Sequence, residues 1–260
     1  MELKDRAAIV TGSGRGIGRG IAVALARAGA SVVVADLPSE QAAMEETKAL
    51  IEAEGAQAHL AHCDVRSESE TKALAQSTID RFGTIDILVN NAGVIAIAPV
   101  VMMSEDDWDR VLDVNLKGTF LASKAVAPHM IERRAGRIVN ISSMAGRRGN
   151  PALAHYCASK WGVIGFTQSL ALELGPLGIT VNAVCPGVVD SAMWRDHLLP
   201  ALGMAQSQAP EAAWEAFLRD RIPLGRAQTP EDIGEAVVYL CRADNVTGEA
   251  INVTGGAELR

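Results

Sequence analysis

The sequence contains no uninterrupted apolar run of membrane-spanning length, although 48% of its 260 residues are hydrophobic. Its first residues, Met1–Arg6, are mostly charged and lack the long apolar core and small-residue cleavage site of a secretory signal. A chain of this length is nevertheless able to bury a sizeable hydrophobic core. We therefore expect a soluble, cytoplasmic protein with no membrane partner.

Paired cysteines are also missing. The four cysteines are scattered along the chain without any Cys-x-x-Cys spacing: Cys63, Cys157, Cys185 and Cys241. This pattern favours buried small side chains in a reducing compartment over a disulfide framework or a metal site.

The chain has no excess of positive charge. Its formal net charge is −7, and the basic pairs Arg133-Arg134 and Arg147-Arg148 are too small to reverse that balance. Proteins that bind nucleic acid usually show a basic face, so we expect no nucleic acid partner.

What the chain does have is a regular alternation of short apolar runs and longer helical patterns. Nearly every position of the short runs is apolar, which is typical of parallel strands covered on both faces. Ser104 and Thr229 are the expected N-caps of two of the helices. The predicted strands are Ala7–Val10, Ser31–Ala35, Ala58–Ala61, Ile85–Val89, Gly136–Ile141, Ile179–Val184 and Glu249–Val253, and predicted helices include Ile17–Ala28, Glu40–Glu54 and Ser67–Phe82. The alternation predicts a single doubly wound α/β domain over residues 1–260, with about seven parallel strands and helices on both faces.

One long segment, Asp190–Gly225, interrupts this pattern. It is longer than a connection needs to be, and it carries large apolar side chains that include Met193, Trp194, Trp214 and Phe217. Long insertions after the carboxyl end of a strand usually shape a site. We expect a lid over the substrate at about residues 190–225; the alternative is a surface helical pair packed on the core.

A glycine-rich loop, Thr11–Gly18, follows the first predicted strand and opens the next helix. Glycines permit a tight turn there and let the backbone approach a pyrophosphate held at a helix N-terminus. Asp36, at the end of the second strand, can accept hydrogen bonds from ribose hydroxyls and would repel a 2′-phosphate. Arg15 favours NADP instead, because its side chain can reach a 2′-phosphate from inside the loop. We expect NAD as the cofactor, with NADP as the less favoured alternative.

Tyr156 and Lys160 stand four residues apart, on one face of a helix, and Ser143 precedes the tyrosine by thirteen residues. A phenol has a pKa of about 10 and is a poor acid or base at neutral pH. A nearby ammonium favours the phenolate and lowers that pKa. Together with the glycine loop, these residues predict an enzyme that moves a hydride and a proton between a nicotinamide cofactor and an alcohol or ketone.

Five motifs, in order along the chain, resemble those of the short-chain dehydrogenase/reductase superfamily. They are Thr11-Gly12-x-x-x-Gly16-x-Gly18, Asn90-Asn91-Ala92-Gly93, Asp113-Val114-Asn115-Leu116, the set of Ser143, Tyr156 and Lys160, and Pro186-Gly187. The resemblance covers essentially the whole chain and implies a Rossmann-type fold. It also implies a homotetramer that packs through the helices near residues 104–131 and 156–175, and chemistry that needs no metal.

The resemblance further implies roles for single residues. Tyr156 would act as general acid or base, Ser143 would hold the substrate oxygen, and Lys160 would bind the nicotinamide ribose and lower the tyrosine pKa. Asn115 would anchor a water that relays protons. The residues implied to bind the cofactor are Gly12, Ser13, Arg15, Gly16, Ile17, Gly18, Asp36, Asp64, Val65, Asn91, Ala92, Gly93, Tyr156, Lys160, Pro186, Gly187, Val189 and Ser191. Of these, Asp64 and Val65 would contact the adenine.

Some of these assignments have alternatives. Asn91 and Asn115 can serve mainly to tie strands and helices together. Ser142 is a second hydroxyl beside Ser143, although the spacing to Tyr156 favours Ser143.

The residues expected to face the substrate are Met144, Asn150, His155 and Trp194. Asn150 and His155 either bind a second hydroxyl or pack behind the site. The segment Asp190–Trp194 resembles polyol dehydrogenases and acetoin or butanediol dehydrogenases of the superfamily. We therefore expect NAD-dependent interconversion of a secondary alcohol (a polyol, sugar alcohol or small diol) and its ketone.

Two other functions remain open from the sequence. One is an NADPH-dependent reductase of 3-oxoacyl thioesters, which would dock an acidic carrier protein on the arginines Arg133, Arg134, Arg137, Arg147 and Arg148. The other is a dinucleotide-binding regulator without turnover, although such a protein would not need a Ser-Tyr-Lys set.

Overall fold

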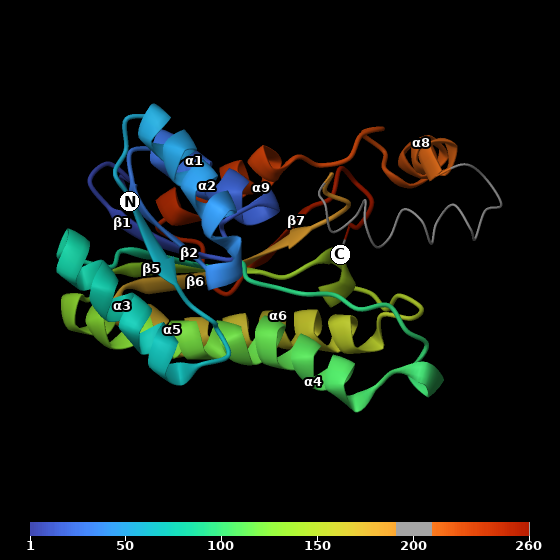
Figure 1. The fold of residues 1–260 in the computed structure, drawn as a ribbon, viewed down its shortest axis with the longest axis horizontal. Coiled ribbons are helices and arrows are strands. Elements are labelled where there is room, and N and C mark those ends of the chain that lie inside the picture. The colour runs from blue at the N-terminus through green and yellow to red at the C-terminus, as the bar shows by residue number, and fades with distance from the viewer. Residues whose placement is uncertain (191–209, 260) are drawn as a thin grey trace.

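One parallel sheet of seven strands forms the centre of the computed structural model, which describes residues 1–190 and 210–259 (Figure 1). The strand order is β3-β2-β1-β4-β5-β6-β7. The strands are β1 (Ala7–Thr11), β2 (Ser31–Asp36), β3 (Ala58–His62), β4 (Ile87–Asn90), β5 (Gly136–Ile141), β6 (Ile179–Pro186) and β7 (Ala250–Val253). The predicted α/β class and parallel sheet are confirmed, and the predicted strand ends differ from the observed ones by no more than two residues.

Helices cover both faces of the sheet (Figure 1). One face carries α1 (Gly16–Arg27), α2 (Gln41–Ala53) and α9 (Pro230–Arg242), and the other carries α3 (Glu68–Phe82), α5 (Gly118–Arg133) and α6 (Ala154–Leu174). The remaining helical elements are η1 (Pro38–Glu40), η2 (Val100–Met102), α4 (Glu105–Leu112), the π-helical turn η3 (Asp113–Lys117), η4 (Met144–Gly146), η5 (Gly175–Leu177) and α8 (Pro210–Arg221). Over the described ranges, no helix has both the length and the apolar character needed to cross a membrane.

The strand side chains alternate between two apolar cores. In β2, Val32 and Val34 lie in the core formed with α1, α2 and α9, whereas Val33 lies in the core formed with α3, α5 and α6. All three side chains are completely buried. A strand that is buried on both faces has to be apolar at each position, which explains the continuous apolar runs of the sequence.

Short polar side chains begin several of the helices. The Ser104 hydroxyl accepts the N–H of Asp107 at 3.1 Å at the start of α4. At the start of α9, Thr229 accepts the N–H of Asp232 at 3.2 Å, and the Asp232 carboxylate accepts the N–H of Thr229 at 2.8 Å. Both predicted N-caps are confirmed, and the reciprocal pair at Thr229 is a capping box.

The strand order changes direction between β1 and β4. From β1 the chain proceeds outward through β2 and β3, and from β4 it proceeds through β5, β6 and β7 toward the opposite edge. In an open parallel sheet, the carboxyl ends of the two strands at this switch point border a crevice that binds ligands. Two groups of the predicted cofactor contacts, residues 12–18 and 91–93, follow these two strand ends.

Close packing of α1 against α9 provides a test of the fold. A Cβ on Gly20 would lie 2.5 Å from the Pro230 Cβ and 2.6 Å from its carbonyl carbon. We expect Gly20→Ala to lower the free energy of unfolding by about 1–3 kcal/mol, because the two helices must move apart. Urea denaturation measures this change.

Gly165→Ala is the matched control, since Gly165 lies inside α6 and a Cβ there would meet nothing within 4 Å. The better helix propensity of alanine should leave this variant as stable as the wild type, or more stable by up to about 1 kcal/mol. Equal stability of the two variants would contradict the proposed tight packing at Gly20.

Candidate active site

The glycine-rich loop between β1 and α1 passes directly beside the loop that follows β4. Gly12 and Gly16 have φ values of +63° and +56°, in the left-handed region that favours glycine. A Cβ on Gly12 would lie 2.7 Å from the Cα of Ala92, and one on Gly18 would lie 2.5 Å from the Asn91 Nδ2. A side chain at either position would therefore push the two loops apart.

Asn91 fastens these two loops together. Its Nδ2 donates to the carbonyl oxygens of Thr11 and Gly12, both at 2.9 Å. The backbone N–H groups of Asn91 and Ala92 donate in turn to the Thr11 hydroxyl, at 3.0 and 3.1 Å. This geometry supports the tying role that the sequence had left open for Asn91.

The N-terminus of α1 suits an anion. Within the described chain, the first turn of α1 has no acidic side chain, and Arg15 at the N-cap position makes no side-chain capping bond. The free N–H groups and the helix dipole therefore attract negative charge. The glycine loop fits the diphosphate of a dinucleotide, and the contacts expected from Gly16, Ile17 and Gly18 stay predictions.

Asp36 closes β2 with a backbone donor on each carboxylate oxygen. The N–H of Gly14 donates to Oδ2 and that of Leu37 donates to Oδ1, each at 2.9 Å. Each oxygen keeps a second lone pair, so the carboxylate can still accept hydrogen bonds from a ribose diol. The neighbouring Ser13 hydroxyl is bonded to the backbone of β1 and β2 at 2.7 and 3.1 Å, so its side chain holds the loop in place.

Asp64 and Val65, the expected adenine contacts, follow β3. The Asp64 carboxylate pairs with Arg66 (Oδ2 to Nη2, 2.6 Å), and this guanidinium lowers the pKa of Asp64. Val65 is buried, and a Cβ on Gly118 would lie 2.6 Å from its Cγ2. Asp64 is thus an ion-paired acid and Val65 a core side chain. Their contacts with the adenine stay predictions.

Ser143, Tyr156 and Lys160 meet where β5 ends and α6 begins. The Ser143 hydroxyl lies close enough to the Tyr156 phenol to lower its pKa, and it accepts the N–H of Ala145 at 3.1 Å. The Nζ of Lys160 lies 5.7 Å from the centre of the Tyr156 ring. Three side chains from two separate segments of the sequence are therefore brought together at the carboxyl end of the sheet.

Ser142 has a different role from Ser143. Its hydroxyl donates to the carbonyl oxygen of Lys160 at 2.9 Å, and the residue is buried. A Cβ on Gly146 would lie 2.5 Å from this hydroxyl oxygen, so the space around it is filled. Ser142 thus holds α6 against β5, whereas Ser143 contacts the phenol.

Burial shifts the pKa of both titratable groups in this set. It raises the pKa of Tyr156, and the nearby Ser143 hydroxyl opposes that change only in part. It also lowers the pKa of Lys160 to about 8, although the Nζ donates a 2.8 Å hydrogen bond to the Ile141 carbonyl oxygen. Desolvation is the largest influence on the Tyr156 phenol, and the expected lowering of its pKa by Lys160 stays a prediction.

Asn115 lies in the π-helical turn η3, which the sequence did not predict. Its Oδ1 accepts the N–H of Val94 at 2.8 Å, and its Nδ2 donates to the Val94 carbonyl and the Ser159 hydroxyl, both at 3.0 Å. Asn115 therefore clamps the loop after β4 to α6, which supports its tying role. The second lone pair of Oδ1 is compatible with the predicted water contact.

Gln228, which no motif singled out, shapes the chain after β6. Its N–H donates to the Val188 carbonyl at 2.9 Å, and its own carbonyl accepts the N–H of Asp190 at 3.0 Å. A Cβ on Gly187 would lie 2.5 Å from the Gln228 Oε1. Gln228 thus positions the predicted cofactor contacts that follow Pro186. This role could be recognised only from the structure, where the segment around Gln228 meets the segment after β6.

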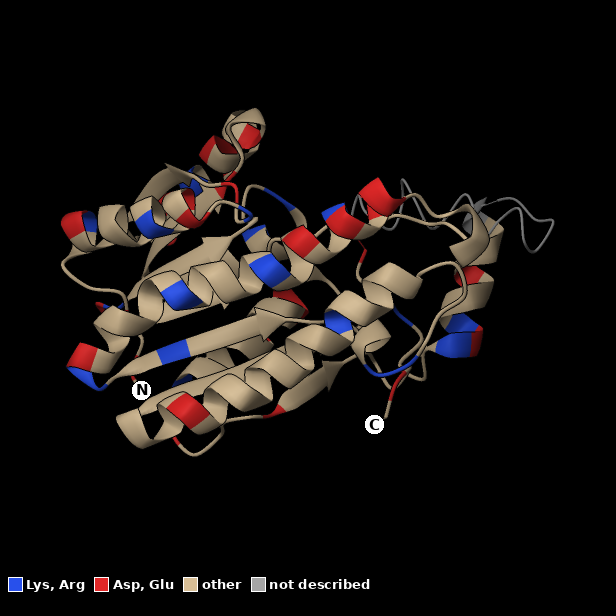
Figure 2. Ribbon diagram, turned by 90° about the horizontal axis from the view of Figure 1, so that it is seen from below, with Lys and Arg blue, Asp and Glu red and all other residues tan. Residues whose placement is uncertain are grey.

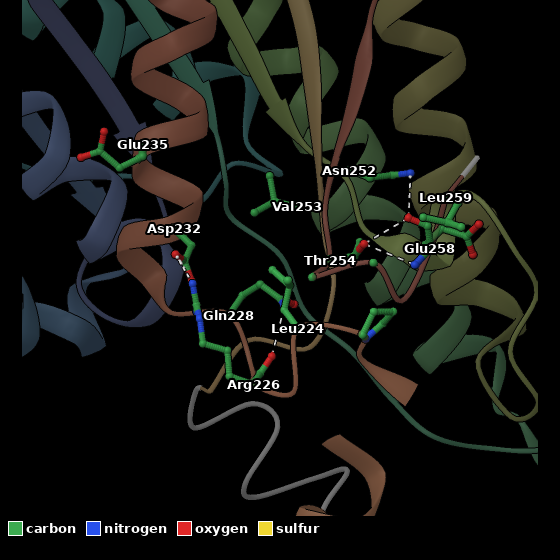
Figure 3. A pocket seen from close by; sticks show the side chains of 13 residues that line it. Leu224, Arg226, Gln228, Asp232, Glu235, Asn252, Val253, Thr254, Glu258 and Leu259 are labelled. Carbon is green, nitrogen blue, oxygen red and sulfur yellow. Dashed lines mark hydrogen bonds and ion pairs between the residues drawn. The ribbon is translucent and has the colours of Figure 1, made fainter. Parts of the chain in front are cut away.

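A separate hollow of about 700 Å³ lies beyond Gln228 (Figure 3). It is lined by parts of residues 223–235 and 252–259. The ion pair of Arg226 with Asp232, at 2.6 Å, crosses one side of it (Figure 3). Among the described residues that line it there is no member of the Ser-Tyr-Lys set, so this hollow lies at the β7 side of the same carboxyl edge, apart from those three side chains.

The predicted substrate contacts differ in their exposure. Met144 and Asn150 are half-buried, so parts of both side chains remain accessible. His155 is completely buried, and within the described chain neither of its ring nitrogens has a hydrogen-bond partner. Burial lowers the pKa of His155, and the charges that act on it, Asp107 and Arg110, belong to α4. These observations favour a packing role for His155.

Two predicted contacts, Ser191 and Trp194, lie outside the described residues. The predicted lid also falls largely there, since only residues 210–225 and Asp190 of this segment are described.

A family model for short chain dehydrogenases matches residues 6–199. The chain belongs to this family. A short-chain dehydrogenase is an oxidoreductase that acts on CH–OH groups and binds a nicotinamide dinucleotide, which agrees with the glycine loop and the Ser-Tyr-Lys set described above.

Proteins similar to this short-chain dehydrogenase act on different substrates. Galactitol 2-dehydrogenase of Agrobacterium fabrum is 39% identical, with 98% of each chain covered. The 3-oxoacyl-acyl-carrier-protein reductase FabG of Thermotoga maritima is 37% identical, with 98% of this chain and 99% of the relative covered. The crystal structure of NAD⁺-bound xylitol dehydrogenase superposes with a TM-score of 0.90 at 32% identity, covering 98% of this chain and 100% of that one.

The buried Lys160 makes stability depend on pH. Its pKa is about 8 in the folded protein and 10.5 in the absence of the fold, so between these values the unfolded chain binds more protons. The contribution of Lys160 to the free energy of unfolding therefore rises from pH 8 to pH 10.5. We expect the wild type to gain on the order of 1–3 kcal/mol relative to Lys160→Met across this window.

Urea denaturation of both proteins at pH 7.5, 9 and 10 measures the difference. The titration of groups remote from Lys160 is common to the two proteins and cancels in the comparison. A difference that stays constant with pH would show that the ammonium is not desolvated in the folded state.

Proposed function

We propose that this short-chain dehydrogenase interconverts a secondary alcohol, such as a polyol, sugar alcohol or small diol, and its ketone with NAD as cofactor. The observation that carries the proposal is the meeting of Ser143, Tyr156 and Lys160 at the carboxyl end of β5. A hydroxyl and a phenol placed this close together can both contact one substrate oxygen. A buried ammonium one helical turn from the phenol supports its change of charge.

The proposed roles follow from this arrangement. Ser143 holds the substrate oxygen, and Tyr156 exchanges a proton with it as general acid or base. Lys160 binds the nicotinamide ribose, and Asn115 holds a water behind it. When bound, the nicotinamide ring takes or gives the hydride, and its oxidised form adds a positive charge that favours the phenolate.

The choice of NAD rests on Asp36. Its carboxylate stands at the end of β2 with both oxygens oriented by backbone N–H groups. A 2′-phosphate carries a charge of about −1.5 to −2 and would be repelled there, whereas the two hydroxyls of a ribose can donate to the carboxylate. The NAD⁺-bound state of the similar xylitol dehydrogenase supports the same choice.

The polyol proposal is supported by similarity to galactitol and xylitol dehydrogenases. The basic surface that a carrier protein would need is engaged within the chain. Its members bond internally as follows: Arg133 to Asp86, Arg134 to the Pro176 carbonyl, Arg137 to the Cys241 carbonyl, Arg147 to the Ala250 carbonyl and Arg148 to Glu258. Acidic segments are interspersed with basic ones across the fold (Figure 2), so the described part of the chain offers little for docking an acidic carrier.

Replacing the proposed acid/base tests the mechanism. We expect Tyr156→Phe to lower kcat by at least about 10²–10⁴-fold, because the ring remains but the proton is lost. Its Kd for NAD⁺, measured by calorimetry, should change little. Tyr239→Phe is the matched control, since Tyr239 is the only other tyrosine of the chain and is 55% exposed on α9. Undiminished turnover by Tyr156→Phe would defeat the mechanism.

A substrate panel tests the substrate class. We expect NAD⁺-dependent oxidation of at least one hexitol, pentitol or 2,3-butanediol, followed as absorbance at 340 nm. Because Asp36 opposes a 2′-phosphate, NADP⁺ should support a slower reaction with the same alcohol. Inactivity on the whole panel together with NADPH-dependent reduction of a 3-oxoacyl thioester would replace the polyol proposal with the reductase alternative.

A further inference from the structure

Arg15 is the one residue of the glycine loop whose charge would favour NADP. Its side chain is 66% exposed and leaves the loop at the N-terminus of α1, next to Gly14, whose N–H contacts Asp36. A guanidinium in this place suits a phosphate on the 2′-oxygen of the adenosine ribose. The proposed use of NAD therefore requires an explanation of what this arginine does.

The structure pairs Arg15 with Glu40. The Arg15 Nη2 lies 3.4 Å from the Glu40 Oε1, and the Glu40 side chain is only 25% exposed. Glu40 is the last residue of η1, a turn that begins directly after Asp36-Leu37 and is closed by a 2.9 Å bond from the Glu40 N–H to the Leu37 carbonyl. This turn returns the chain toward the glycine loop and so brings a second carboxylate to the ribose end of the proposed cofactor site.

The other arginine near the loop is occupied in a different way. The Arg19 guanidinium donates to the Gly14 carbonyl at 2.7 and 3.1 Å and to the Thr47 hydroxyl at 2.9 Å. It also reaches the Ala43 carbonyl and the Glu46 carboxylate, at 3.1 and 2.9 Å. Arg19 therefore holds the loop to α2, whereas Arg15 pairs with Glu40.

We propose that Glu40 is a second cofactor-specificity residue, which pairs with Arg15 and so prevents this guanidinium from serving a 2′-phosphate. The proposal rests on the proposed binding of NAD at Asp36. Asp36 acts directly on the ribose, by accepting hydrogen bonds from its hydroxyls. Glu40 acts through Arg15, by pairing with its guanidinium and by adding a negative charge that a 2′-phosphate would have to approach.

The proposal predicts a selective gain in affinity for a 2′-phosphorylated ligand. In Glu40→Gln, Arg15 loses its ionic partner, and one negative charge near the 2′-oxygen is removed. At a solvated site we expect the preference for ADP-ribose over 2′-phospho-ADP-ribose to fall by about three- to tenfold. ADP-ribose itself has no phosphate at that position, so its Kd should stay nearly unchanged.

Calorimetric titration with these two ligands tests the proposal without any turnover. Neither ligand contains nicotinamide, so the result depends on the adenosine end alone. Glu40 stands at the N-cap position of α2 but makes no side-chain capping bond, so glutamine should not disturb the helix. Thermal unfolding of the variant checks that the fold is retained.

Two further variants separate the pair from a general effect of charge. Glu45→Gln removes the same charge from α2, where Glu45 accepts a hydrogen bond from Gln41 at 2.9 Å and has no contact with Arg15. This control should keep the preference of the wild type. Combining Glu40→Gln with Arg15→Gln should remove the gain, because the freed guanidinium is its source.

The outcomes distinguish this proposal from the proposed function. A gain in Glu40→Gln that disappears with Arg15→Gln supports it. An unchanged preference in Glu40→Gln, or an equal change in Glu45→Gln, overturns it and leaves NAD binding at Asp36 standing. If the wild type fails to bind ADP-ribose, the cofactor proposal and this inference fall together.

Discussion

The burial of the Lys160 ammonium at the carboxyl end of β5 is the constraint on which the catalytic end of the molecule depends. A buried charge is unfavourable unless it is paired or hydrogen-bonded, and Lys160 donates to the Ile141 carbonyl. The Ser142 hydroxyl returns a bond to the Lys160 carbonyl. These two bonds run in opposite directions between β5 and α6 and set the position of the helix along the strand. Tyr156, one turn earlier on the same helix, is thereby positioned beside Ser143.

A buried polar network secures the same arrangement across four elements. The Asn90 Nδ2 donates to the Asn140 Oδ1 and the Ser123 hydroxyl, at 2.8 and 3.0 Å, and the Asn140 Nδ2 donates to the Thr167 hydroxyl at 2.9 Å. The network joins β4 and β5 to α5 and α6, while the next residue, Asn91, joins β4 to the glycine loop. Hydrogen bonds of this kind specify one arrangement of a core more sharply than apolar contacts do. The two adjacent asparagines thus connect the proposed cofactor site to the catalytic helix.

The sequence predicted the elements whose signal is local. The strands were visible because burial on both faces demands continuous apolar runs such as Val32–Val34, and the caps at Ser104 and Thr229 are short-range patterns. The candidate site was found because its members occur in spaced motifs.

Features that arise only when distant segments meet were not predictable. The π-helical turn contains Asn115, which bonds to Val94 in another segment, and the role of Gln228 follows from its closeness to Gly187. The Tyr156–Lys160 spacing predicts a nearby ammonium, so the pKa of Tyr156 was expected to fall. The same spacing says nothing about how far the phenol is desolvated. Burial, which the motif does not encode, decides the direction.

The raised pKa of Tyr156 has a consequence for the direction of the proposed reaction. A phenol is already protonated at neutral pH, burial raises the pKa of Tyr156 further, and Lys160, with a pKa of about 8, remains charged at neutral pH. The protein alone therefore presents a proton donor, which suits reduction of a ketone. Oxidation of an alcohol requires Tyr156 to act as a base, and this needs a further positive charge in the same cleft, which an oxidised nicotinamide supplies and a reduced one does not. Under the proposed function, the charge of the cofactor therefore determines whether the same phenol donates or accepts the proton.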